Sequence, residues 1–467
     1  MTARPRDGIV AIAIALFLLG GVALDTWGPK VAPARPPAAA EPEFDARAVF
    51  CPPALRRPAS RVTVTATARG NEPVDVSFAP WSDERVGLAP GSTLELVPPG
   101  AEPAEPADAV DVVGYGGRVD ATVVTSVDEP VSGVGGAACA PAAATRWYFP
   151  EGNSTVTHDE RLLIYNPFPD EAVVRVALLT PGGERTKAGL SDVAVPSESS
   201  IALAINDFVF EQKVLGAIVT AVRGRVVAWR LSIARPEEKP SGVEFTLGAS
   251  SLRDTWYFPE GAVGAGFEER ISVMNPGNTE ATVEITLVTD SKALPAAGAT
   301  EVPVPARSTV AIVLDESALP GERGGAGAIV RSVNRVPVVV ERTVFYATEE
   351  FDGVASEIGS SRPSKRWLLG PATSRPGTDS AVLLNATGQD VRVTLTLIGA
   401  EGRPLRPRSL ANLTLAAGAR LRVPLGELTD GEPYAVLVEA TGKVVAERFS
   451  YSAGAGDVSS LMGTPLE

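Results

Sequence analysis

The sequence predicts an all-β protein: tandem immunoglobulin-like β-sandwich domains that follow an N-terminal transmembrane helix. A phrase of three aromatic residues and a turn recurs about every 110 residues. Short stretches of alternating apolar and polar residues, separated by turn residues, fill each repeat. An uncharged apolar segment lies near the amino terminus. Repeats of about 90–110 residues are too long for the blades of a β-propeller and suit sandwiches of seven or eight strands.

The N-terminal segment predicts export and anchoring in a membrane. Residues 8–24 carry no charge and follow Arg4 and Arg6, which would leave residues 1–7 in the cytoplasm and the remaining chain outside. A helix of this length falls slightly short of the roughly 30 Å hydrocarbon core, so a retained anchor and a cleaved signal peptide that releases the protein both remain open. We favour the anchor, because the segment is not followed directly by small residues at cleavage spacing. Residues 25–49, rich in proline and alanine, predict an extended linker.

Composition supports a folded exterior part and limits the classes of partner. The chain is 45% hydrophobic and only 21% charged, and its 45 glycines and 40 prolines supply many turns. The net charge of −14 argues against nucleic acid as a partner and against adhesion to an anionic membrane surface.

Residues 50–140 are expected to form a divergent first sandwich closed by a disulfide. Cys51 and Cys139 are the only cysteines, and they flank this block. An exported location favours their pairing, and two unpaired thiols are the alternative. Alternating stretches predict strands at residues 61–66, 74–78, 92–97 and 121–127. The block has no aromatic opening phrase.

Three further sandwiches are predicted over residues 141–250, 251–360 and 361–467. Each begins with an opener, a short strand that ends in a turn whose glycine tolerates positive φ. The opener residues are Trp147, Tyr148, Phe149 and Gly152, then Trp256, Tyr257, Phe258 and Gly261, and finally Trp367. We expect the aromatic rings to fill the core, because one buried tryptophan supplies much of a small sandwich's apolar area. A shelf for a ligand is the alternative.

An acidic residue early in each repeat and an arginine late in it recur at nearly constant spacing. The sets are Glu160 with Arg230, Glu269 with Arg342, and Asp379 with Arg448. We expect the two members to meet within their repeat in a two-pronged ion pair. Independent solvated charges at strand ends are the alternative.

The opener, the Glu-Arg pair at Glu160-Arg161 and Glu269-Arg270, the Asn-Pro turn and a closing valine-to-glycine signature together resemble an actinobacterial family of exported, membrane-anchored proteins of unknown function. The resemblance covers residues 146–463 strongly. It implies a cell-envelope location and an array of sandwiches, and it carries over no catalytic or binding residue.

Little in the sequence indicates an enzyme, a cofactor or a metal. His158 is the only histidine, and we read it as a solvated loop residue. Glu151 with Glu160, or Glu260 with Glu269, could form a glycosidase pair, but their recurrence in two repeats indicates a structural role. We therefore expect a non-enzymatic cell-envelope protein for structural or binding use, with wall glycan or envelope proteins as partners. The alternative is an accessory subunit of an enzyme that processes wall or envelope polysaccharide.

Overall fold

Antiparallel β-strands build the part of the chain that the structure describes, as the alternating patterns predict. The structure is a computed structural model that describes residues 46–466, with gaps at 54–60, 70–71, 91, 97–108, 128–130, 132, 236, 238–239, 265, 319–323, 348–351, 371–377, 400–403, 427, 429–433 and 453–456. The predicted tail and apolar segment at residues 1–24, and the linker up to residue 45, lie outside the described residues. Among those described, no helix is long and apolar enough to cross a membrane.

The first two repeats contain the following elements. In the first repeat they are β1 (Ala46–Cys51), β2 (Arg61–Arg69), β3 (Val74–Ala79), β4 (Ser82–Leu88), β5 (Thr93–Leu96), β6 (Val110–Tyr115), β7 (Arg118–Val127) and β8 (Gly133–Ala138). In the second they are β9 (Arg146–Phe149), β10 (His158–Asn166), β11 (Ala172–Thr180), β12 (Gly183–Arg185), β13 (Val193–Val195), β14 (Ser199–Ala204), β15 (Gly216–Arg223), β16 (Val227–Ala234) and β17 (Gly242–Leu247), with 3-10 turns η1 (Ala188–Leu190) and η2 (Ile205–Asp207). The first strand thus begins inside the predicted linker, because Val49 and Cys51 alternate into the core.

The last two repeats follow the same sequence of strands. The third contains β18 (Thr255–Phe258), β19 (Ala262–Val263), β20 (Phe267–Asn275), β21 (Ala281–Val288), β22 (Ala293–Pro295), β23 (Val302–Val304), β24 (Ser308–Leu314), η3 (Glu316–Ala318), β25 (Gly324–Gly325), β26 (Gly327–Ser332), β27 (Val339–Ala347) and β28 (Asp352–Ile358). The fourth contains β29 (Ser364–Leu369), β30 (Thr378–Leu384), β31 (Val391–Ile398), η4 (Arg408–Leu410), β32 (Leu413–Leu415), β33 (Arg420–Pro424), β34 (Ala435–Ser452), β35 (Asp457–Met462) and β36 (Thr464–Pro465).

Each repeat supplies two antiparallel sheets, which we call inner and outer. In the second repeat the inner sheet has the order β14-β10-β16-β17 and the outer sheet the order β12-β11-β15-β9. The first repeat has the same arrangement, with β5-β2-β7-β8 and β1-β6-β3-β4, which identifies it as a divergent copy. In the fourth repeat the long strand β34 runs through both sheets and joins them into one.

This strand order differs from that of an immunoglobulin domain. There the first strand shares a sheet with the second, whereas here the opener β9 pairs with β15, in the sheet opposite β10. The prediction of an all-β chain with several antiparallel sheets is confirmed, and the strand order of these sheets is not that of an immunoglobulin domain. Turn spacing and alternation indicate the number of strands, but they carry no information on which strands pair.

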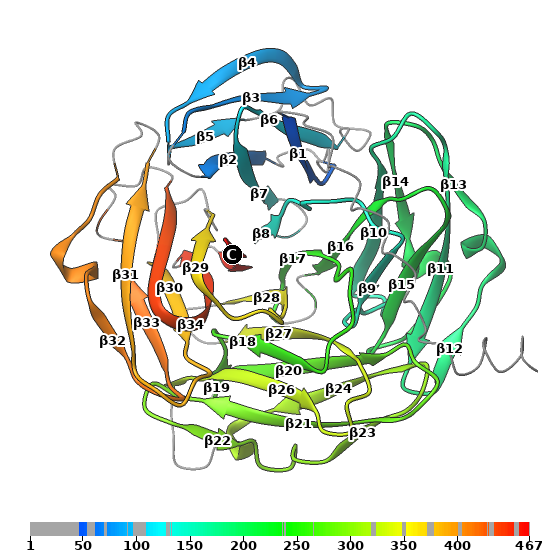
Figure 1. The fold of residues 1–467 in the computed structure, drawn as a ribbon. Helices are drawn as coiled ribbons and strands as arrows, with labels where there is room; N and C mark the ends of the chain where they lie inside the picture. The colour runs from blue at the N-terminus through cyan, green and yellow to red at the C-terminus, as the bar shows by residue number, and fades with distance from the viewer. Residues whose placement is uncertain are drawn as a thin grey trace, which may run out of the picture. The chain divides into compact units, whose positions relative to one another are not determined.

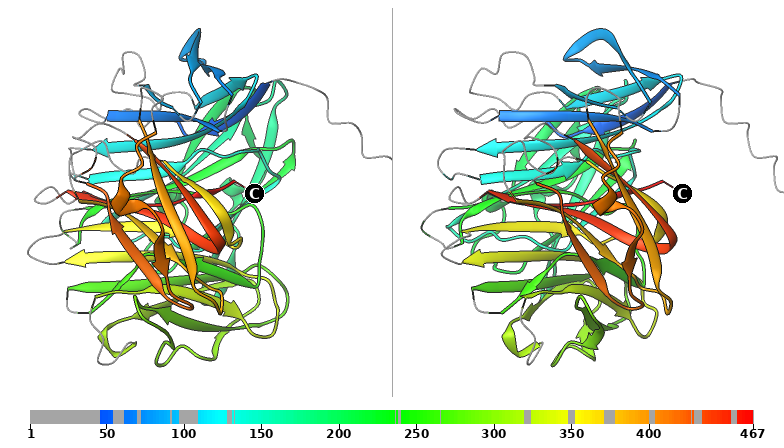
Figure 2. Two further views of the ribbon diagram at one scale, coloured as in Figure 1. Left: turned by 60° about the vertical axis from the view of Figure 1, so that its left-hand side comes forward. Right: turned by 90° about the vertical axis from the view of Figure 1, so that its left-hand side faces the viewer.

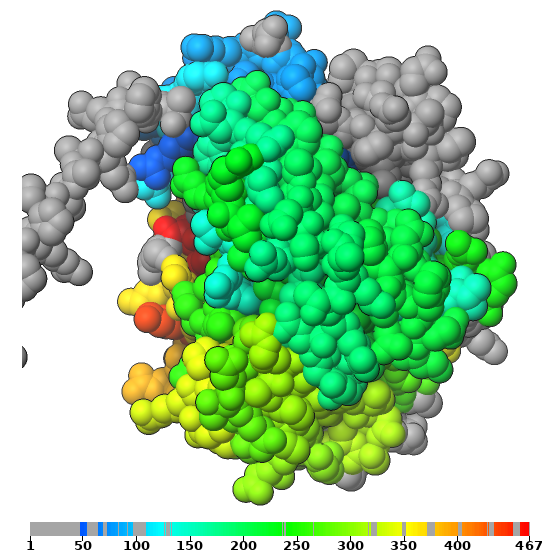
Figure 3. Space-filling model, turned by 90° about the vertical axis from the view of Figure 1, so that its right-hand side faces the viewer, coloured from blue at the N-terminus to red at the C-terminus, as the bar shows by residue number. Residues whose placement is uncertain are grey.

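The four repeats close into a ring instead of standing in a line. The last strand of each inner sheet contacts that of the next in the cyclic order β8, β17, β28, β35 and back to β8 (Figure 1). Residues from Ala46 onward accordingly form one compact unit. Two side views show the blue strands of the first repeat above, the green strands of the third below, and the fourth between them in orange (Figure 2). Seen from outside, the surface of the second repeat continues directly into that of the third (Figure 3).

The predicted disulfide between Cys51 and Cys139 is confirmed. This disulfide replaces an aromatic contact of the second and third repeats. The backbone pairs Phe50 with Ala140 as it pairs Tyr148 with Ala249, so Cys51 takes the place of Phe149, and Cys139 that of Gly248. A Cβ on Gly248 would lie 2.6 Å from the Phe149 ring, which explains the glycine that ends the closing signature.

Alternation along each opener sends its rings to two different cores. Trp147 and Phe149 are buried in their own repeat, and the indole of Trp147 donates to the Val226 carbonyl at 2.7 Å. Tyr148, between them, points the other way and belongs to the core of the third repeat. Tyr257 likewise packs against the core of the fourth. The openers are therefore core residues, as expected, and they also join neighbouring repeats.

We predict that Trp256→Ala destabilises the protein by about 3–5 kcal/mol, because it opens a large cavity and removes the indole hydrogen bond to Val338. Urea unfolding of the purified protein would measure this. Val333→Ala, at a side chain that is 44% exposed in the same repeat, is the control and should change stability by under about 0.5 kcal/mol. Equal stabilities of wild type and Trp256→Ala would contradict the core role.

Candidate functional site between the third and fourth repeats

The turn after each of the first two aromatic openers carries a glutamate into the next repeat. The backbone N–H of Glu151 donates to Glu341 at 3.1 Å, and that of Glu260 donates to Glu447 at 3.0 Å. Glu151 and Glu260 are only 4% and 2% exposed. Glycine follows each of them because a Cβ at Gly261 would come within 2.3 Å of the Ala326 carbonyl oxygen. The turn glutamates are therefore components of the contacts between repeats, which we call seams.

The late arginines of the second and third repeats cross the same seams. Arg230 pairs with Glu341 of the third repeat at 2.7 Å. Arg342 pairs with Glu447 of the fourth repeat at 2.6 Å. These two pairs are nearly inaccessible to solvent, so the seam between the second and third repeats and the seam between the third and fourth each contain a buried ion pair. Sequence reasoning had expected Arg230 and Arg342 to pair with Glu160 and Glu269 of their own repeats.

Only the fourth repeat forms the predicted internal pair. Arg448 donates through Nε to Asp379 at 3.0 Å and makes a second contact through Nη2, as the two-pronged prediction requires. The repeat that follows in the ring is the first, where strand register puts Thr122 in the place of Glu341 and Glu447. Arg448 has no glutamate to reach there, and it pairs within its own repeat.

Glu160, Glu269 and Asp379 differ in the direction of their pKa shifts, because only Asp379 pairs directly with the arginine of its own repeat. Burial raises the pKa of Glu160 and of Glu269 to about 8, and the nearby arginines only partly offset that effect. Burial also acts on Asp379, but the guanidinium of Arg448 holds its pKa below the ordinary value. Burial likewise raises the pKa of Glu341 to about 7. One repeat position thus carries a neutral acid or a carboxylate, depending on where its arginine points.

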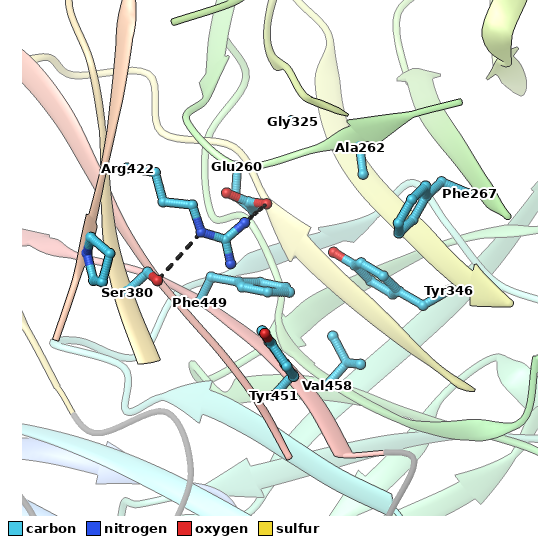
Figure 4. A pocket seen from close by; sticks show the side chains of 11 residues that line it. Glu260, Ala262, Phe267, Gly325, Tyr346, Ser380, Arg422, Phe449, Tyr451 and Val458 are labelled. Atoms are coloured by element: carbon cyan, nitrogen blue, oxygen red, sulfur yellow. Dashed lines mark hydrogen bonds and ion pairs between the residues drawn. The ribbon is translucent and has the colours of Figure 1, made fainter. Parts of the chain in front are cut away.

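A cavity of about 270 Å³ lies at the seam between the third and fourth repeats. Its walls include Phe267 and Tyr346 from β20 and β27, and Phe449 and Tyr451 from β34 (Figure 4). The polar side is formed by Glu260, Arg422 and Ser380. Arg422 donates to Glu260 and to Ser380, both at 3.3 Å, and its guanidinium lies over the Phe449 ring.

The equivalent position at the preceding seam is filled differently. Arg270, which corresponds in register to Ser380, donates to Glu151 at 3.3 Å. A serine in place of that arginine leaves space at the later seam, which Arg422 enters from β33. A second cavity, of about 370 Å³, beside Arg270 and His158, has only Phe267 and Phe345 as aromatic lining.

His158 is not the solvated loop residue that the sequence suggested. It begins β10, is 9% exposed, and its ring nitrogens lie within 3.3 Å of Thr155, Thr157 and Asn153 oxygen or nitrogen atoms. Among the described residues, no group of three or more histidine, cysteine, aspartate or glutamate side chains could hold a metal ion. The described seams therefore offer paired charges and aromatic cavities.

Several residues of this site were not predicted from the sequence. Tyr346, Phe449, Arg420 and Arg422 belong to no motif that recurs in all repeats. A signal existed for the seam pairs: Glu341 and Arg342 are adjacent on one strand, so they must face opposite sides and cannot both serve one repeat.

Comparison with known proteins places most of the chain in a family. The model of DUF5719, described as a family of unknown function, matches residues 125–315 and 252–459. No curated protein matches. Among solved structures, the Thermotoga maritima protein 1070 is 23% identical over 24% of this chain and 97% of its own, with a TM-score of 0.21. The Anabaena sensory rhodopsin transducer is 27% identical over 20% of this chain and 85% of its own, with a TM-score of 0.17.

We predict that Arg342→Met costs about 3–5 kcal/mol, because it strands the buried Glu447 carboxylate. The exposed pair Arg331–Glu284 is the matched control, and Arg331→Met should cost under about 1 kcal/mol. Urea unfolding of both variants and of Arg342→Met/Glu447→Met tests this. The double variant should lose less than the sum of the single losses, and an additive result would show that the two side chains do not interact.

We predict that Glu269→Gln makes stability less dependent on pH. The folded-state pKa of Glu269, about 8, lies above the ordinary value of 4.5, so its stabilising effect is complete below about pH 4.5 and is lost as pH rises towards 8. Between pH 5 and 8 the unfolding free energy should therefore fall less steeply for Glu269→Gln than for wild type. The exposed Glu301→Gln is the control and should keep the wild-type slope. Equal slopes in all three proteins would refute the assignment.

Proposed function

We propose that this chain, which belongs to the DUF5719 family of unknown function, is a non-enzymatic cell-envelope protein that binds a ligand outside the membrane. Residues 8–24 would anchor it, and the ring of repeats would present the cavity between the third and fourth repeats as the binding site. The observation that carries the proposal is this cavity, in which aromatic walls surround a few oriented polar groups, the usual composition of a ligand site.

The disulfide supports an external location. Cys51 and Cys139 are joined, and no free cysteine is present. Disulfides persist in oxidising compartments and are rare in the reducing cytosol of most organisms. An uncharged segment preceded by two arginines at the amino terminus agrees with export.

The charged groups of the cavity are fixed by contacts with one another. Its carboxylate, Glu260, contacts the guanidinium groups of Arg422 at 3.3 Å and Arg420 at 3.5 Å. Two guanidinium groups therefore hold this carboxylate in place, which suits Glu260 to orienting its neighbours and a ligand.

The test uses the full-length protein and its cavity-filling variant Ala262→Phe. A soluble extract of the cell envelope should raise the melting temperature of the wild type, since a ligand that binds only the folded state stabilises it. Ala262→Phe should lose this response, and Val333→Phe, at an exposed site in the same repeat, should keep it. Protease treatment of intact spheroplasts should digest the ring.

Two results would overturn the proposal. One is protection of the ring from protease in intact spheroplasts, which would place it inside. The other is an equal response of wild type and Ala262→Phe to the extract. Co-purification of the protein with a wall-processing enzyme, without a response to the extract, would favour the accessory-subunit function instead.

A further inference from the structure

The aromatic walls of the cavity present flat apolar faces at two angles. Phe267 and Tyr346 are perpendicular, with ring centroids 5.7 Å apart, and Tyr346 and Phe449 are tilted by 34° at 5.8 Å. Tyr451 continues this wall at 6.1 Å from Phe449. Such a surface suits a ring whose faces are apolar C–H groups, and it does not suit a strongly hydrated ion.

One hydroxyl in this wall has no partner among the described residues. Tyr346 is 4% exposed, and within the described part of the chain its hydroxyl makes no hydrogen bond. In Figure 4 the hydroxyl points from its wall towards the side where Glu260, Arg422 and Phe449 lie. Burial raises the pKa of this phenol well above its ordinary value, and the charge of Glu260 adds to the effect, so it remains a proton donor. Because Tyr346 lines the cavity, its hydroxyl can donate a hydrogen bond to an acceptor on a ligand there.

The charges around the cavity balance. Glu260 contacts Arg420 and Arg422, and Arg420 also contacts Asp290 at 2.8 Å. Two carboxylates thus meet two guanidinium groups. An anionic ligand would compete with Glu260 for the arginines, and a cationic ligand would meet a carboxylate that is already paired. The balance favours a neutral ligand.

Size restricts the ligand further. The volume of about 270 Å³ lies just below the roughly 300–1,000 Å³ of sites for drug-sized molecules, so it has room for one six-membered ring. A neutral ring with apolar faces and a polar edge that accepts and donates hydrogen bonds is a pyranose.

We propose that the cavity binds a single neutral hexopyranose unit, one face against the Phe449 and Tyr346 rings and a hydroxyl or ring oxygen accepting from the Tyr346 hydroxyl. This inference rests on the proposed binding function and names its ligand class. The preceding seam does not share the site, because Arg270 occupies the position of Ser380. The proposal therefore concerns the single site at the seam between the third and fourth repeats.

The test is calorimetric titration of the full-length protein in detergent with the methyl glycosides of glucose, mannose and galactose. At least one should bind with a stoichiometry of one. Tyr346→Phe, which removes only the hydroxyl, should weaken that sugar at least tenfold. Tyr257→Phe removes a hydroxyl from the same repeat outside the cavity and should leave affinity unchanged. Equal urea midpoints would show that the Tyr346→Phe protein is folded.

Three comparison ligands test whether the cavity prefers a neutral sugar to other classes of ligand. Glucuronate, choline and phenol represent an anion, a cation and an aromatic ring, and each should bind at least tenfold more weakly than the best glycoside. The inference is overturned if no methyl glycoside binds, if Tyr346→Phe binds like wild type, or if phenol binds as tightly as the sugar. Stabilisation by envelope extract together with any of these results would leave the binding function intact and remove only its sugar ligand.

Discussion

A buried guanidinium group needs a carboxylate, and in this protein the carboxylate belongs to the next repeat. Arg230 and Arg342 are each 1% exposed, and each reaches a glutamate across a seam. A guanidinium without that partner would have to leave water with nothing to offset the loss of hydration. The second, third and fourth repeats therefore cannot separate without exposing or stranding charges, and this constraint favours packed repeats over independent domains on a string.

Equivalent backbone positions in different repeats are joined by different kinds of contact. Phe149 lies over Gly248 in the second repeat, and a covalent bond joins Cys51 to Cys139 at the corresponding place in the first. Where the neighbour offers Thr122 instead of a glutamate, Arg448 pairs with Asp379 inside its own repeat. The recurring motifs keep the same contacts in each repeat. Where a motif residue differs, the residue that it faces in the structure differs as well.

The cavity follows from one such departure. Because Ser380 stands where Arg270 stands in the preceding repeat, Glu260 is met instead by Arg420 and Arg422 from a different strand. Arg422 lies over the Phe449 ring, and aromatic side chains of both repeats line the cavity beside it. A site specific to one seam can in this way arise in a ring of otherwise similar repeats, through the exchange of a large residue for a small one.

The sequence by itself determined the class, the repeat and the local roles. Alternation predicted β10, β11 and most other strands, and the openers were correctly expected in the core, because a two-residue period and a recurring aromatic phrase depend only on local order. The two cysteines allowed only one internal disulfide. The Asp379–Arg448 pair was also within reach, since both members belong to one repeat.

Tertiary structure alone decided pairing between repeats. Strand order and ring closure depend on contacts between residues far apart in the chain. The spacing of turns in the sequence does not predict these contacts. Equal spacing of Glu160 to Arg230 suggested an internal pair, yet Glu341 lies nearer to the guanidinium because the third repeat packs against the second. The cavity likewise exists only where Tyr346 and Phe449 meet across a seam. Local sequence determines which faces of a strand are apolar, whereas the packing of whole sheets decides which charges and rings those faces meet.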